Sequence, residues 1–296
     1  MRVRRAVSAD KTPVLEFCRH TWSWGDYLPE VWDQWLKDRS GWLLVATVNR
    51  RPVGLAHARF QNSKVVWLEG VRVHPSYRGQ GIAGKLNNEL CRLALEKGAR
   101  LARLCTTSTN KSSKKHLSKV KFELLAKFQR FDSVNPIKKR PAKVSLRRKY
   151  SSALWKWLRA GTEFEHCKEL YSDDGWTWYP FTYRTLQRFT EKRDVLVTGS
   201  EAPTSCSLFT GEEGHLTIGF TAGPVEEIRD HVRYLRYLLS KGQYQKSRAL
   251  IPENSHFIGV LKEEEYEKSG KILVYEKLLG KDEAYKSDRA QNLQIV

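Results

Sequence analysis

The most informative stretch of the chain reads VRVHPSYRGQGIAG and runs from Val71 to Gly84. Alternating valines at its start favour a strand, and the glycines that follow let the backbone turn tightly and approach a ligand closely. Apolar side chains then recur on one helical face, at Ile82, Leu86, Leu90 and Leu93. They predict a helix over 81–97, whose free N–H groups and dipole form an anion site at its start. The stretch therefore predicts a strand, a turn and a helix that could bind a diphosphate.

The residues around this stretch predict a meander of strands with flanking helices. Before it, strands are expected over 3–7, 42–48, 52–60 and 65–73, and helices around 14–18 and over 30–38. After it, a strand over 99–107, a helix over 111–121 and a last strand over 123–131 complete a first domain, residues 1–132. The expected fold class is therefore α/β (α+β), with a mixed, mostly antiparallel sheet.

Composition divides the chain after this domain. Residues 133–159 hold nine basic residues, no acidic residue and two prolines, which is typical of a linker. Residues 160–296 then repeat the order of the first half, with strands over 194–198, 205–210, 215–221, 248–252 and 271–277, and helices over 224–239 and 255–266. We expect a second domain that arose by duplication.

Positive charge is concentrated in one region. The net charge is +19, and residues 97–159 contain 19 Lys and Arg residues against Glu123 and Asp132. Such a region attracts phosphates, from a nucleotide cofactor to nucleic acid, or an anionic surface. The linker over 133–159 could contact nucleic acid or an acidic partner, or could simply be solvated, since no RNA-binding motif accompanies it.

The remaining composition argues against several classes. Five scattered cysteines without a CxxC pair favour reduced thiols over disulfides or a zinc ribbon, and eight histidines show no ligand spacing, so no metal site is expected. No apolar run approaches the ~18 residues of a membrane span, and the charged amino terminus does not resemble a signal peptide. We expect a cytoplasmic protein without a membrane span.

The turn does not have the GxxxxGK[ST] spacing of a P-loop, so we do not expect nucleotide hydrolysis. We do not expect the dinucleotide redox chemistry of a Rossmann turn either. Arg78, Gly81 and Ala83 instead match [RQ]xxGx[GA]. This motif, in the order of elements predicted over 1–132, resembles the acetyl-CoA signature of the GNAT acetyltransferase superfamily. The resemblance implies a GNAT fold followed by a second GNAT-like half, and an N-acetyltransferase with acetyl-CoA as cofactor.

The resemblance also implies a cofactor site. Its expected residues are Val71, Val73, Arg78, Gly79, Gln80, Gly81, Ile82, Ala83, Gly84 and Asn110. The backbone N–H groups of 79–84 would hold the pyrophosphate, Val71 and Val73 would pair with the pantetheine arm, and Asn110 would open the second half of the site. Two positions depart from the family pattern, because Leu117 stands where many members have a tyrosine that protonates the thiolate, and Lys121 replaces a glycine. Ser112, Ser113 and His116 lie near enough in sequence to be tested as the proton donor.

Glu69 is the expected catalytic base. It lies on the strand before the turn, where GNAT members often supply a carboxylate near the acceptor, and its apolar neighbours could raise its pKa. Direct acetyl transfer needs a neutral amine, and an α-amine, with a pKa of ~7.7–8.0, is easier to deprotonate than lysine. The alternative is that Glu69 pairs with a neighbouring arginine such as Arg72.

The acceptor is expected beside residues 25–30, where GNAT proteins form the walls of the acceptor site. This segment and residues 68–73 are short stretches that resemble the corresponding sequences of histidine N-acetyltransferase and its relatives. Those proteins also carry a second half. The similarity implies a small amino acid or similar amine as acceptor, with Asp26 attracting its amine or imidazolium and Tyr27 stacking on it. The alternatives for the two residues are a helix cap and a core aromatic.

The second half lacks a phosphate turn, because residues 221–224 offer one glycine and then a proline without an N–H group. We expect it to cover the acceptor cleft, with Trp176 and Trp178 in the wall unless they belong to the core. Two further hypotheses stay open for the whole chain. One is acetylation of a protein lysine or amino terminus, and the other is a nucleic-acid-associated protein in which acetyl-CoA is only a ligand.

Overall fold

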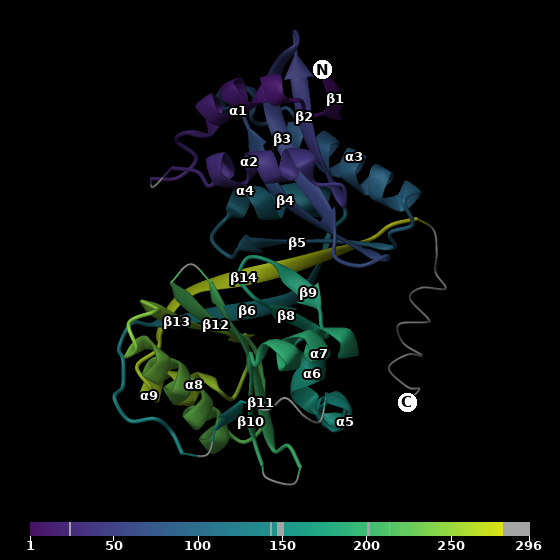
Figure 1. Cartoon of the computed structure of the whole chain (residues 1–296). Helices are drawn as coiled ribbons and strands as arrows, with labels where there is room; N and C mark the ends of the chain where they lie inside the picture. The colour runs from purple at the N-terminus through teal and green to yellow at the C-terminus, as the bar shows by residue number, and fades with distance from the viewer. Residues whose placement is uncertain (24, 143, 147–150, 200–201, 213, 281–296) are drawn as a thin grey trace. The chain divides into compact units, whose positions relative to one another are not determined.

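A computed structural model describes residues 1–23, 25–142, 144–146, 151–199, 202–212 and 214–280, which form two compact units (Figure 1). The first unit comprises Met1–Leu104, Asn110–Glu123 and the described residues from Tyr275 onward, and the second comprises Cys105–Thr109 and Leu124–Val274. No helix among the described residues is long and apolar enough to cross a membrane. In the same part of the chain, no group of three or more His, Cys, Asp or Glu residues could hold a metal ion.

The first unit is built on an antiparallel meander. Strands β1 (Arg2–Arg5), β2 (Gly41–Val48), β3 (Arg51–Phe60) and β4 (Val65–Val73) pair in this order, and β5 (Leu101–Thr107) runs parallel to β4. The helices are α1 (Lys11–Cys18), α2 (Leu28–Lys37), α3 (Ile82–Glu96) and α4 (Lys111–Lys119), and there are two short 3-10 helices, η1 (Ser8–Asp10) and η2 (Pro75–Tyr77). These elements confirm the predicted fold class and the predicted order of strands and helices.

Two apolar layers cover the two faces of this sheet, because successive side chains of a strand point to opposite faces. On β2, Leu43 and Val45 pack with Trp32 of α2 and Val14 of α1. Trp42, Leu44 and Ala46 of the same strand pack on the other face, with Ile82, Leu86 and Leu90 of α3. Figure 1 shows α1 and α2 on one side of the meander and α3 on the other. The sheet is therefore fixed from both sides.

Strand β4 contains a bulge at Gly70. Leu55 of β3 lies opposite Arg72, whereas His57 lies opposite Glu69, so β4 has one residue more than β3 over this span. Gly70 has a φ of +69°, which favours glycine, and an added Cβ would lie 2.5 Å from the Trp35 ring. The bulge thus requires a residue without a side chain and sets the direction of Glu69.

The second unit repeats the meander. Strands β10 (Val195–Thr198), β11 (Ser205–Glu212) and β12 (His215–Ala222) are antiparallel, α8 (Val225–Leu239) follows, and β13 (Lys246–Pro252) runs parallel to β12. The order is that of β2, β3, β4, α3 and β5, which confirms two GNAT-like halves. The further elements are β6 (Glu123–Ser133), β7 (Ser145–Leu146), α5 (Ser151–Ala160), α6 (Thr162–His166), β8 (Leu170–Ser172), β9 (Trp178–Pro180), α7 (Tyr183–Lys192), α9 (Ile258–Glu263) and β14 (Glu267–Leu278).

The core of the second unit lies between α8 and its sheet. Ile228, Val232 and Leu235 of α8 pack with Ile218 of β12 and Ile251 of β13. Trp178 belongs to the interior, since its side chain is fully buried and its ring lies 5.3 Å from that of Phe128. Trp176 is 47% exposed. The two tryptophans predicted to line the wall of the acceptor cleft therefore have different surroundings.

The unit boundaries fall at other residues than the sequence predicts. The main segment of the second unit begins at Leu124 rather than after residue 132, because β6 pairs with β13. The described residues from Tyr275 onward return to the first unit, where the Leu279 N–H donates to the Arg100 carbonyl. The segment 133–159, expected to be a linker, contains β7 and most of α5. Lys143 and residues 147–149 of its basic run lie outside the described residues.

Replacing Gly70 with alanine tests the bulge. We expect Gly70→Ala to lower the free energy of unfolding by about 2–4 kcal/mol, because the new Cβ adopts a strained φ and collides with Trp35. Gly98→Ala is the matched control, since Gly98 has a φ of +92° but an added Cβ would meet nothing within 4 Å, and only about 1–2 kcal/mol of strain is expected. Equal losses in urea denaturation would show that Trp35 does not constrain residue 70.

Candidate active site

The turn after β4 faces open space. His74 and η2 lead to Gly79 and Gly81, whose φ values are +80° and +76°, and Gly81 directly precedes α3 as its N-cap. A Cβ added at either glycine would meet nothing within 4 Å. The positive φ explains why glycine is needed, and the open space leaves the backbone accessible to a ligand.

The start of α3 supplies hydrogen-bond donors. The helix ladder begins with the Lys85 N–H, which donates to the Gly81 carbonyl over 3.1 Å, so the N–H groups of Ile82, Ala83 and Gly84 have no acceptor one turn earlier. These donors lie at the positive end of the helix dipole, and the donor set suits a phosphate group. Gly84 lies close to α4, and an added Cβ would make ordinary van der Waals contact with Val120 at 3.4 Å and His116 at 3.6 Å.

Two side chains of the turn are used locally. The Arg78 guanidinium donates through Nε to the Val73 carbonyl over 3.3 Å, and the Gln80 amide nitrogen lies 3.5 Å from the Ser76 carbonyl oxygen. Both side chains brace the turn, which leaves the binding role to the backbone.

The last residues of β4 have an open backbone edge. The ladder with β5 covers Val65–Trp67 against Leu101–Arg103 and stops there. The His74 N–H donates to Val53 of β3 over 2.9 Å, so Val73 and Val71, which alternate with it, direct their N–H groups away from β3. The edge that the sequence assigns to a pantetheine arm thus has two N–H donors that β3 does not use.

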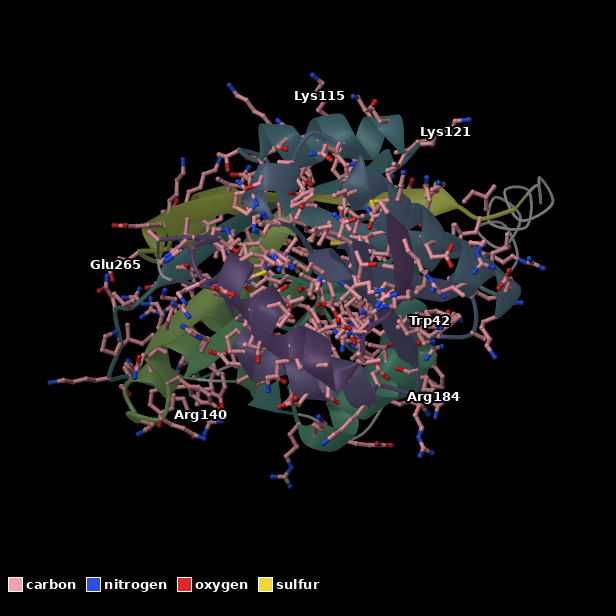
Figure 2. The ribbon with its side chains drawn as sticks, turned by 90° about the horizontal axis from the view of Figure 1, so that it is seen from above. Trp42, Lys115, Lys121, Arg140, Arg184 and Glu265 are labelled. Carbon is pink, nitrogen blue, oxygen red and sulfur yellow. The ribbon has the colours of Figure 1, made fainter. Side chains whose placement is uncertain are left out.

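Helix α4 adds positive charge to the first unit. Asn110 is its N-cap, and the side-chain oxygen accepts from the Ser113 N–H over 2.9 Å. Five lysines follow, namely Lys111, Lys114, Lys115, Lys119 and Lys121, with no acidic residue between them. Lys115 on the helix and Lys121 just after it point outward (Figure 2). The Asn110 side chain is therefore engaged in capping the helix. The lysines can complement the charge of a phosphate.

Leu117 and His116, next to each other on α4, have different surroundings. Leu117 is buried in the core of the first unit and has no proton to give. His116 accepts a hydrogen bond at Nε2 from the Asn87 side-chain amide over 3.1 Å. Burial, together with the charge of Lys119, lowers the pKa of His116, so its ring is neutral near pH 7.

Glu69 contacts a histidine and an arginine. Its Oε1 lies 2.9 Å from Nδ1 of His57 and 3.6 Å from Nε of Arg59, and its side chain is 19% exposed. Both contacting residues come from β3. The alternative that Glu69 pairs with a neighbouring arginine is met by Arg59 and not by Arg72, which binds Asp26. Sequence reasoning missed His57, whose position opposite Glu69 depends on the bulge at Gly70.

Arg72 instead binds Asp26 on the loop between α1 and α2. Nε and one terminal nitrogen of Arg72 lie 2.8 and 3.3 Å from the two Asp26 oxygens, and the Asp26 side chain is 2% exposed. Asp26 also accepts a hydrogen bond over 3.1 Å from the N–H of Leu28, the first residue of α2. Burial is the largest single effect and lowers the pKa of Arg72, but hydrogen bonding to Asp26 and Tyr27 and the charges of these two groups together raise the pKa above its usual value. Asp26 thus holds the loop in place, and this role replaces the predicted attraction of an amine.

This Arg72–Asp26 clasp orders an aromatic group next to Glu69. The guanidinium carbon of Arg72 lies 4.4 Å from the Trp22 ring centroid and 5.2 Å from that of Tyr27. Tyr27 is stacked on Trp22 and meets the edge of Trp35. Burial raises the pKa of Tyr27, and the charge of Glu69 adds to this effect. Tyr27 and Glu69 are therefore within electrostatic reach of each other.

A double-mutant cycle tests the clasp. With Asp26→Ala, Arg72→Met and the double variant, we expect a coupling energy of about 2–3 kcal/mol, because each charge is buried and loses its partner in the single variants. The matched control is the Lys11–Asp33 pair, whose side chains are 34% and 61% exposed and whose coupling should stay below about 1 kcal/mol. A coupling for the clasp as small as that of the control would contradict a structural role.

The second unit lacks an equivalent turn. Pro224 is the N-cap of α8 and has no N–H group, and a Cβ added at Gly223 would lie 2.5 Å from Cβ of Ser205. The glycine before α8 is thus packed against a neighbouring strand, whereas Gly79 and Gly81 face open space.

Comparison with known proteins agrees with this geometry. Residues 11–122 match the model of the acetyltransferase (GNAT) family. No curated protein matches the chain, so the finer resemblance to histidine N-acetyltransferase has no counterpart there.

Three solved structures show the same fold at low identity. A GCN5-related N-acetyltransferase from Sphaerobacter thermophilus is 12% identical with a TM-score of 0.63, over 94% of this chain and 95% of that one. A tandem GNAT protein from the clavulanic acid biosynthesis pathway is 12% identical with a TM-score of 0.55, over 95% and 99% of the two chains. The glucosamine N-acetyltransferase region of a fungal multi-domain GH3 β-N-acetylglucosaminidase is 13% identical with a TM-score of 0.64, over 93% of this chain and 38% of that one. Residues 11–122 thus resemble the GNAT family of acetyltransferases, and the solved structures share the fold of the chain.

Proposed function

We propose that this chain transfers the acetyl group of acetyl-CoA directly to the amine of a small molecule, with Glu69 as the base. The observation that carries the proposal is that β4 holds Glu69, ends at Val73 with an open backbone edge and leads into the glycine turn. One rigid strand thus brings a carboxylate and a donor-rich backbone together.

The turn and the strand edge fit acetyl-CoA, which the GNAT family generally uses. When bound, acetyl-CoA would supply the acetyl group as an activated thioester. The N–H groups of residues 79–84 would hold its pyrophosphate, and the edge at Val71 and Val73 would pair with its pantetheine arm. A side chain at Gly79 or Gly81 would meet no protein atom within 4 Å, so the space in front of the turn is free for this group.

Glu69 would remove a proton from the acceptor's ammonium group and leave the neutral amine that can attack. His57 and Arg59 both contact Oε1, and Oε2 would take the proton. An α-amine with a pKa of ~7.7–8.0 needs only a weak base near pH 7. The free N–H donors of Val71 and Val73 can stabilise negative charge that develops on an acyl oxygen.

A small acceptor is favoured by the aromatic side chains that the clasp holds near Glu69. Trp22 is 39% exposed, and Tyr27 lies between it and Trp35. Such rings suit a compact amine, for example a free amino acid. Acetylation of a protein amino terminus or lysine would use the same base and is the second candidate, whereas no observation on the described residues supports a nucleic-acid partner.

Glu69→Gln tests the base. The assay is release of coenzyme A thiol from acetyl-CoA with free histidine, other amino acids, polyamines and short peptides offered in turn. We expect kcat to fall by about 10²–10⁴-fold and the Kd for acetyl-CoA to change less than about twofold, because the amide cannot accept the proton.

Glu96→Gln is the control, because its side chain on α3 is 57% exposed, and turnover should not change. Unchanged turnover in Glu69→Gln would eliminate the base assignment. Turnover with peptides alone would favour the second candidate, and acetyl-CoA binding without any acceptor would leave only the cofactor site.

A further inference from the structure

His57 lies between two carboxylates in the interior of the first unit. Its side chain is fully buried, its Nδ1 lies 2.9 Å from Oε1 of Glu69, and its Nε2 lies 3.6 Å from Oδ2 of Asp38. The contact to Glu69 is a hydrogen bond, whereas 3.6 Å is too long for one. Nε2 has no hydrogen-bonding partner among the residues that the structure describes. The ring is thus bound at one nitrogen only.

The chemistry of the pair fixes the position of the proton. An ionised carboxylate has no hydrogen to donate, so Nδ1 of His57 must carry the proton and donate it to Glu69. Oε1 is then held by this bond, with the charge of Arg59 3.6 Å away. Tyr27, which is also titratable, interacts electrostatically with Glu69.

The surroundings of His57 prevent the ring from turning. Trp35 stacks on it with centroids 4.4 Å apart and the planes 5° from parallel. The bulge at Gly70 makes room for that indole, and the β3–β4 register places His57 directly opposite Glu69. A buried polar side chain held this firmly and bonded only to the proposed base is arranged to orient that base.

We propose that His57 is a positioning residue for acetyl transfer, which rests on the proposed role of Glu69. The Nδ1–H of His57 holds Oε1 and thereby aims Oε2 at the acceptor. His57 touches neither substrate nor cofactor and acts only through Glu69. Its removal should lower kcat while the acetyl-CoA turn, formed by other residues, keeps its affinity.

Three substitutions of His57 test the proposal in the thiol-release assay. In His57→Asn the side-chain NH₂ can occupy the place of Nδ1 and donate to Glu69, in His57→Gln the amide reaches the place of Nε2, and in His57→Phe no donor is present. We expect kcat to fall by about 10–100-fold in His57→Phe and His57→Gln, and His57→Asn to recover about tenfold of that loss. The Kd for acetyl-CoA should stay within about twofold, which also shows that the first unit is folded.

The outcomes separate this inference from the proposed function. Unchanged turnover in Glu69→Gln overturns the base and the inference together. If Glu69→Gln is impaired but all three His57 variants retain full turnover, or all three lose it equally, the base stands and positioning through Nδ1 is wrong.

A measurement on the unsubstituted chain covers the case in which the His57 variants do not fold. Nitrogen-15 NMR should show one buried histidine that carries its proton at Nδ1 and whose signals change in Glu69→Gln. A histidine protonated at Nε2 and not at Nδ1 would overturn the inference.

Discussion

The short pairing between β4 and β5 is the constraint on which the site depends. Among the described residues, the two strands pair over three residues of each, and Leu68 to Val73 of β4 lie beyond this pairing. The backbone N–H groups that a longer pairing with β5 would use can therefore bind a ligand. The same stretch carries Glu69, the bulge at Gly70 and Arg72, and it leads directly into the glycine turn.

Two side chains of β4 contact different parts of the first unit. Glu69 meets His57 and Arg59 on β3, while Arg72, after the bulge, reaches the loop between α1 and α2 and binds Asp26. Without the extra residue at Gly70, every later side chain of the strand would point to the other face of the sheet. The bulge, the stacked Trp35 and the clasp therefore form one arrangement that orients the proposed base and the aromatic side chains beside it.

Much of the first unit follows from local patterns in the sequence. Valine alternation, the glycine turn and the spacing of Ile82, Leu86 and Leu90 predict β4, the turn and α3, since each depends on residues close in sequence. The letters of residues 79–84 also spell the GxGxxG of a dinucleotide-binding turn. That motif belongs to a mostly parallel, doubly wound sheet, whereas β4 pairs antiparallel with β3. The pairing of the strands around the motif, and not its letters, therefore distinguishes an acetyl-CoA signature from a dinucleotide-binding turn.

Contacts between distant residues were harder to predict. The partner of Arg72 and the partner of Glu69 both depend on an exact register with one bulged residue, which alternation alone does not reveal. Asp26 was expected to face an amine because a lone carboxylate in a loop gives no sign of an arginine 46 residues away. The return of Tyr275 to the first unit likewise depends on tertiary pairing, so a division at a basic, proline-containing segment misplaced the boundary.

The central claim is that the open backbone turn before α3 holds acetyl-CoA, and calorimetric titration of acetyl-CoA into the chain and into Gly81→Ala tests it most directly. An added Cβ at residue 81 would meet no protein atom, and any loss beyond its φ strain must therefore come from the ligand side. We expect binding to weaken by about tenfold or more, while Gly98→Ala, with a similar φ outside the turn, binds as the unsubstituted chain does. Equal affinity in all three proteins, or no binding to the unsubstituted chain, would contradict the account.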